Sequence, residues 1–221
     1  MADTIGGGIN EDGSLQNTIV IDEKYAESID IVGLENAGVT ELAINKPIKN
    51  VEIGLKGDVD TAIAGARLAN AEIVNEAPAG ETASVVIAVT KAKNLEFTTT
   101  GEGATDFSAG EGRVMKPTIT TADSDAQDSI SFGLASTVKS ADISTGGGSD
   151  TIVFDGRMKG KSILATGDGA DVIEVNRASG KGKLRITDFS SDDTLIVDGV
   201  TITTDNLEDA PKWIKFGGDP R

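Results

Sequence analysis

Two glycine-rich turns in the second half of the chain each end in an aspartate that an apolar strand follows. They read Thr145-Gly-Gly-Gly-Ser-Asp150 and Thr166-Gly-Asp-Gly-Ala-Asp171. Calcium takes six to eight hard oxygen ligands at about 2.3–2.6 Å, and glycine lets a turn backbone point its carbonyls inward. Carboxylates from two such turns, stacked one strand spacing apart, can converge on one ion. The turns therefore predict one or two calcium sites, although glycine and aspartate are also common in ordinary turns.

These aspartates belong to a repeat of about 22 residues that runs through most of the chain. Its markers, separated by 22, 22, 21 and 22 residues, are Asp106, Asp128, Asp150, Asp171 and Asp193. A fixed period of this length is typical of stacked copies of one small unit. A short apolar stretch follows each marker, and a stretch in which apolar and polar residues alternate precedes it, as in half-buried strands. Each repeat is therefore expected to form one rung with two strands.

The fold class that this repeat predicts is all-β: a single-stack, right-handed parallel β-solenoid of about nine rungs of ~22 residues. The right hand is expected because parallel crossovers are nearly always right-handed. Three segments are predicted: a cap or arm over 1–16, the solenoid over 17–200, and a cap or docking tail over 201–221. Trp213 in the last segment is expected to plug the final rung. Residues 62–72 have a helical composition, which the period of the repeat overrides.

One position of the first strand in each rung is predicted to face inward and is polar in most rungs. Its occupants are Leu55, Asn75, Thr99, Thr121, Thr145, Thr166 and Asp188. Threonine hydroxyls at one register can bond from rung to rung.

The composition disfavours several classes of function. The net charge of −16 disfavours binding to nucleic acid. Cysteine and histidine are absent, so thiolate metal sites and the commonest general base are missing. Aromatic residues make up 4% of the chain, too few for a platform that stacks on sugars. No apolar run approaches the ~20 residues of a membrane span, and the N-terminus does not resemble a secretory signal peptide. We expect no nucleic-acid partner and no membrane insertion.

The two turns resemble the nonapeptide of the RTX (haemolysin-type) calcium-binding repeat family, G-G-x-G-x-D-x-U-x with U apolar. A second segment, residues 185–197, resembles the one that commonly closes RTX blocks, I-x-D-F-x-x-x-x-D-x-I. The resemblance is best over 145–199. The turns match the nonapeptide at Gly146, Gly148, Asp150 and Ile152, and at Gly167, Gly169, Asp171 and Ile173.

The resemblance implies a parallel β-roll with calcium as the candidate cofactor, held between turns of successive rungs. The metal ligands that it implies are the carboxylates of Asp150 and Asp171, with a further carboxylate from Asp168 and with Asp193 serving the next gap. The implied carbonyl ligands come from Gly146, Gly148, Gly167 and Gly169. This chain departs from the RTX pattern, which repeats every nine residues and carries metal turns on both edges.

On these grounds we expect a non-enzymatic structural protein. It would be an acidic β-solenoid rod on the exterior of a larger assembly, such as a capsid or tail decoration of a phage or virus, where it has protein partners and forms homo-oligomers or arrays. The expected location is a virion surface, or the extracellular or cell-surface space. The alternative is a secreted or surface-layer RTX-type calcium-binding protein. Two minor alternatives stay open: a β-helix enzyme that acts on polysaccharides, and an ice-binding protein with rows of threonine.

Overall fold

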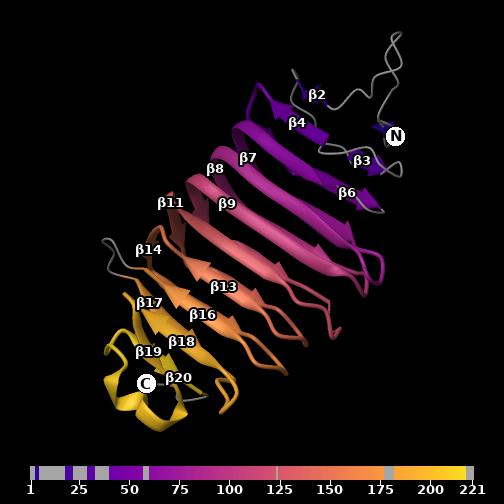
Figure 1. Ribbon diagram of the computed structural model, residues 1–221. Helices are drawn as coiled ribbons and strands as arrows, with labels where there is room; N and C mark the ends of the chain where they lie inside the picture. Colours follow the sequence, from indigo (N-terminus) through magenta and orange to yellow (C-terminus); the bar gives the residue numbers. More distant parts are fainter. Residues whose placement is uncertain are drawn as a thin grey trace.

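The structure is a computed structural model that describes residues 3–4, 18–21, 29–32, 40–56, 60–122, 124–176 and 182–217. Most of these residues are in β-strands, and one short 3-10 helix, η1 (Thr204–Asp209), lies near the C-terminus. The strands stack into one solenoid (Figure 1). Their bounds are β1 (Asp3–Thr4), β2 (Thr18–Ile21), β3 (Ile29–Val32), β4 (Thr40–Ile44), β5 (Ile48–Lys49), β6 (Glu52–Lys56), β7 (Thr61–Glu76), β8 (Thr82–Thr99), β9 (Ala104–Met115), β10 (Thr118–Thr120), β11 (Ser129–Lys139), β12 (Asp142–Ser144), β13 (Thr151–Phe154), β14 (Arg157–Lys159), β15 (Lys161–Ala165), β16 (Val172–Val175), β17 (Lys183–Ile186), β18 (Thr194–Val197), β19 (Val200–Ile202) and β20 (Ile214–Phe216).

The parallel β-solenoid that the repeat predicts is confirmed, with about seven turns ~22 residues apart instead of nine. At the N-terminal end β1, β2 and β3 continue the parallel pairing, and the segments between them lie outside the described residues. The cap predicted over 1–16 also lies outside the described residues, apart from β1. The segment 62–72, with its helical composition, lies within the strand β7.

Each complete turn contributes to three sheets, where the sequence predicts two strands. Sheet 1 comprises β1, β3, β6, the C-terminal parts of β7 and β8, and then β10, β12, β15, β17 and β20. Sheet 2 comprises β2, β4, the N-terminal parts of β7, β8, β9 and β11, and then β13, β16 and β18. Sheet 3 comprises β5, the middle of β7 and β8, the ends of β9 and β11, and β14.

The corner between sheets 3 and 1 is turned by a residue with left-handed backbone. In successive turns φ lies between 51° and 56° at Asn50, Asn70, Asn94, Lys116 and Ser140. Asparagine tolerates this conformation better than most residues with a side chain. The side-chain amide of Asn94 donates to Asn70 Oδ1, and the side-chain amide of Asn70 donates to Asn50 Oδ1, both at 2.8 Å. This corner therefore combines the turn with a contact from one rung to the next.

The core is a set of columns in which each turn repeats the apolar residue of the last. Phenylalanine rings from different inward columns of sheets 1 and 2 contact one another in the core. The ring centroids of Phe107 lie 5.0 Å from Phe97 and 6.2 Å from Phe132, and Phe132 lies 5.2 Å from Phe154. All four side chains are buried. Aromatic contacts at such distances add to the free energy gained by burying the rings.

The C-terminal segment ends the parallel stack. β19 pairs antiparallel with β18 through a tight hairpin at Asp198 and Gly199, both with positive φ, and β20 adds to sheet 1 beside β17. Trp213 is partly buried against the core. The Phe216 ring lies 5.0 Å from that of Phe189. Aromatic side chains of the tail thus pack on the last turn.

Candidate functional site: the aspartate corner

The corner between sheets 1 and 2 carries the glycine-rich turns that the sequence singles out. We call it the Asp corner, and it comprises the described residues of the loops 77–81, 100–103, 121–128 (without 123), 145–150, 166–171 and 187–193. In the turns 121–128, 145–150 and 166–171 a threonine directly follows the sheet 1 strand, and an aspartate directly precedes the sheet 2 strand. The backbone therefore brings the predicted polar residues together along one line of the stack.

The aspartates form a ladder of hydrogen bonds from turn to turn, which we call the Asp ladder (Asp128, Asp150, Asp171 and Asp193). The Asp128 amide donates to Asp150 Oδ1 at 2.8 Å, and the Asp150 amide donates to Asp171 Oδ1 at 2.9 Å. The Asp171 amide donates to Asp193 Oδ1 at 3.1 Å. At most 3% of any of these residues is exposed. Each carboxylate supplies an acceptor to a buried amide, which would otherwise cost about 1–3 kcal/mol.

Asp106 does not belong to this ladder, and its place as a repeat marker is a correction to the sequence analysis. In the strand register Asp106 aligns with Ser129, and Phe107 aligns with Ile130. The residue at the ladder position is Thr105, whose amide donates to Asp128 Oδ1 at 2.7 Å. The loop before Asp106 contains one extra residue, so the sequence spacing points to the wrong side of the strand.

Burial perturbs the acidity of the ladder. Desolvation, reinforced by the neighbouring Asp128 and Asp171 carboxylates, raises the pKa of Asp150 to about 7, against hydrogen bonding from Thr145 and from the Asp128 amide. Burial also raises the pKa of Asp128 and of Asp171. The Oδ2 atoms of Asp150 and Asp171 are buried and have no hydrogen-bond partner. Stacked like charges in a desolvated column favour the neutral acid.

The inward threonine column that the sequence predicts is confirmed beside the ladder, with Thr99, Thr121, Thr145 and Thr166 all buried. The Thr121 hydroxyl donates to the Thr145 carbonyl at 2.7 Å, and the Thr145 hydroxyl donates to the Thr166 carbonyl at 3.1 Å. The threonine hydroxyls thus link successive turns along the same corner as the Asp ladder.

Comparisons with family models, with curated proteins and with solved structures found no match. Within the described ranges no helix is long and apolar enough to cross a membrane.

The glycines of the corner allow the turns to stack closely. Gly167 has φ of 85°, and a Cβ added there would lie 1.5 Å from the Gly146 carbonyl oxygen. At Gly169, with φ of 139°, a Cβ would lie 1.6 Å from the Gly148 carbonyl oxygen. Neither position can hold a side chain unless the backbone moves. Contact between adjacent turns therefore accounts for these glycines.

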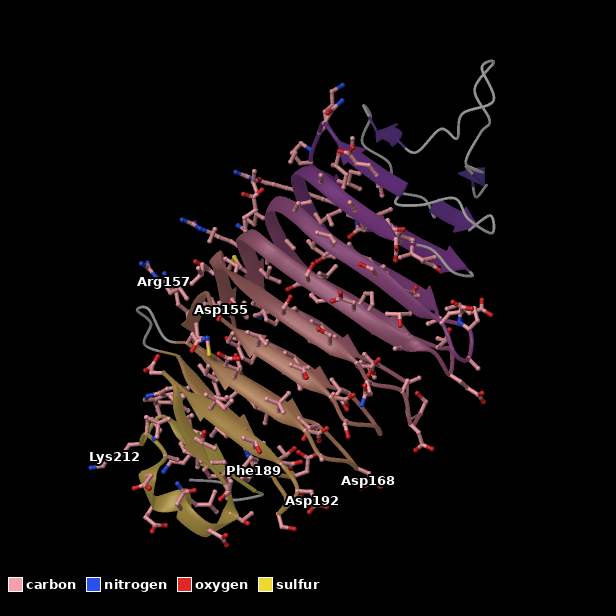
Figure 2. The ribbon with its side chains drawn as sticks, viewed as in Figure 1. Asp155, Arg157, Asp168, Phe189, Asp192 and Lys212 are labelled. Carbon is pink, nitrogen blue, oxygen red and sulfur yellow. The ribbon has the colours of Figure 1, made fainter. Side chains whose placement is uncertain are left out.

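The residues implied as calcium ligands are brought to this corner, where several of their carboxylate oxygens already accept amides, while Oδ2 of Asp150 and of Asp171 have no partner. Oδ1 of Asp150 and of Asp171 accept amides, and both carboxylate oxygens of Asp193 do so. The Gly146 carbonyl accepts the Asp168 amide at 3.1 Å. The Asp168 side chain is exposed at the outer margin (Figure 2). No group of three acidic side chains in the described part of the chain is placed to hold a metal ion. This geometry does not fit a preformed calcium cage, and the calcium site stays a prediction.

Asp188 is a residue of the corner that the implied ligand set leaves out. Its two carboxylate oxygens accept the amides of Thr166, at 3.2 Å, and of Gly167, at 2.9 Å. It aligns with the threonine column, so one carboxylate replaces a threonine and holds the glycine turn of the preceding rung. Its place in the segment I-x-D-F is the signal that marks it in the sequence.

Proposed function

We propose that this chain is a non-enzymatic structural protein, a short acidic solenoid that forms one component of a larger assembly. The observation that carries the proposal is the Asp ladder. The buried carboxylates and hydroxyls are the side chains best suited to acid–base chemistry. Here they accept or donate hydrogen bonds from turn to turn. In this arrangement they fix the register and rigidity of the stack.

The surface supports the same proposal. A surface groove at the corner has a volume of about 770 Å3, and its charged lining residues are Glu81, Glu102 and Asp125. Its other lining residues are small or carry an amide or hydroxyl. In this groove, acids have no histidine or cysteine as a partner for acid–base or nucleophilic chemistry. A rigid, charged surface of this kind suits contact with other macromolecules.

We place the assembly on the exterior of a phage or virus particle, as a capsid or tail decoration, with a cell-surface layer as the alternative. A net charge of −16 keeps an exposed component soluble until it is assembled. The test is labelling of intact particles and intact cells with an antibody against the full chain, together with its copy number in purified particles by mass spectrometry. We expect external labelling and many copies per particle. A chain found only in the soluble fraction, or an activity on anionic polysaccharide that one point mutation abolishes, would contradict the proposal.

A further inference from the structure

One face of this acidic protein is basic. The side chains that point outward from sheet 3 alternate with its buried residues, and they form two columns that run along the stack. Lysine or arginine occupies eight of these eleven positions, and aspartate and glutamate occupy none. We call the eight cations the basic edge. In chain order the outward positions are Lys49, Arg67, Ala69, Lys91, Lys93, Arg113, Met115, Thr137, Lys139, Arg157 and Lys159.

The cations of the basic edge repel one another. Strand register places Arg67 beside Lys91 and Lys91 beside Arg113, at the ~4.8 Å spacing of adjacent strands. Like charges directly opposite in a sheet are destabilising. In the described part of the chain no hydrogen bond or ion pair joins a side chain of the edge to an acid; the nearest acids along the chain, Glu111 and Asp155, flank the edge. A partner that brings negative charge would relieve this repulsion.

The matching negative charge lies on the opposite side of the same molecule. Five of the six loops of the Asp corner carry an exposed acid, and we call these acids the acidic rim: Glu81, Glu102, Asp125, Asp168 and Asp192. The corner joins sheets 1 and 2, so it lies across the solenoid from sheet 3. Figure 2 shows Arg157 of the edge at one margin and Asp168 and Asp192 at the other.

We propose that the basic edge of one copy docks on the acidic rim of the next copy, so that the chain assembles side by side into an open array. This inference rests on the proposed structural function and names one partner in the assembly, a second copy of the chain. Edge and rim advance together by one turn, ~4.8 Å along the axis, so their charges match in register over several turns. The groove at Glu81, Glu102 and Asp125 receives the cations. Because the two surfaces differ, the contact is heterologous, and because they lie on opposite sides of the molecule, successive copies add side by side.

A linear polyanion is the other partner that a basic edge could take. A second copy is favoured because it carries acids at the repeat distance of the edge itself. A free polyanion would also approach a protein with a net charge of −16, which opposes its binding at low ionic strength.

Self-association of the full chain tests the proposal. We expect sedimentation velocity at 20 mM NaCl to show a series of oligomers that grows with protein concentration, and 500 mM NaCl to return the chain to monomer. The double variant R67E/R113E is expected to weaken association by roughly a hundredfold. The control variant K212E/K215E changes the net charge equally at exposed residues away from the edge, and it is expected to associate like the wild type. Circular dichroism checks that each variant folds.

A mixing experiment identifies the two surfaces. The edge variant R67Q/R113Q keeps an intact rim, and the rim variant E81Q/E102Q/D125N keeps an intact edge. Each alone is expected to stay largely monomeric, and their mixture is expected to form dimers and few larger species. Monomer at millimolar concentration and 20 mM NaCl would overturn the proposal, as would equal loss in the edge and control variants. Monomer that binds dextran sulfate through Arg67 and Arg113 would overturn it in favour of a polyanion. Labelling of particles could still succeed in these cases, which separates this failure from failure of the proposed function.

Discussion

Protonation of Asp150 is expected to stabilise the solenoid. The pKa of this carboxyl rises from 3.8 to about 7 on folding, chiefly because the group is desolvated. Such a rise corresponds to at most about 4 kcal/mol. Relaxation of the corner and partial screening by solvent reduce this, and we expect about 2 kcal/mol. Because the folded state binds the proton more tightly than the unfolded state, the contribution is fully present below pH 3.8 and is lost as pH rises through about 7.

The assay is urea unfolding of the full chain in EDTA at several pH values between 3.5 and 8.5, with D150N as the test variant. The side-chain carbonyl of asparagine can accept the Asp128 backbone amide as Asp150 Oδ1 does, and the side chain carries no charge at any pH. It therefore imitates the protonated acid at every pH. We expect D150N to match the wild type within about 1 kcal/mol at pH 3.5, below the unfolded pKa, and to be about 2 kcal/mol more stable at pH 8.5.

The control for this experiment is D168N, which removes one negative charge from an exposed side chain in the next turn of the same corner. It corrects for the general relief of repulsion in a protein with a net charge of −16. The stability gain at high pH should be confined to D150N. A D150N variant that is less stable than the wild type at pH 8.5 would refute the reasoning, because it would show that the charged carboxylate stabilises the corner.

Three further predictions concern the calcium site, the glycine turn and the phenylalanine core. Thermal melts by circular dichroism are expected to give equal Tm values in EDTA and in millimolar calcium; a rise of several degrees in calcium that D150A and D171A abolish would instead support the predicted calcium site. G167A is expected to destabilise the fold by more than about 3 kcal/mol in urea unfolding, because the new Cβ would overlap the Gly146 carbonyl. G199A, with a similar φ but no atom within 4 Å of its Cβ, is expected to cost only about 1 kcal/mol, and equal losses would contradict the stacking argument. F132A is expected to lower the free energy of unfolding by about 3–5 kcal/mol in the same assay, because it leaves a cavity between two other rings. A loss below about 1 kcal/mol would show that the phenylalanine contacts contribute little to the stability of the core.

The fold could be predicted from the sequence because the strands, the corners and the stacking of turns all follow the same period. The spacing of Asp128, Asp150 and Asp171 sets the length of a turn, and the inward threonine column lies in the register that the sequence predicts. The period also predicts correctly that β7 is a strand. The composition around Leu68 favours a helix, but the segment pairs with β8 on one side and with β4, β5 and β6 on the other. Tertiary pairing outweighs local propensity there.

Sheet 3 was harder to predict from the sequence because its strands are short and most of their outward residues are charged. A strand such as Arg157–Lys159 has a single buried residue, Met158, which is too little to establish a period of two. Its neighbours in the stack supply the missing evidence, since Val114, Val138 and Met158 share one inward column. Only alignment of the turns on each other reveals both that column and the charged columns beside it.

The role of the corner aspartates could not be read from their spacing, because the same residues suit two arrangements. A carboxylate that points across the gap between turns can bind a cation, and one that points along the stack can accept the amide of its counterpart. The choice depends on whether that amide has another acceptor. Here the Asp128 and Asp150 carbonyls accept the Thr151 and Val172 amides of the following turn, while the aspartate amides themselves lie at a corner where the backbone changes direction. Buried amides must be satisfied, and only the next aspartate reaches them. The ladder thus fixes register at a corner where sheet pairing is interrupted, which is where a stack of short strands would otherwise slip.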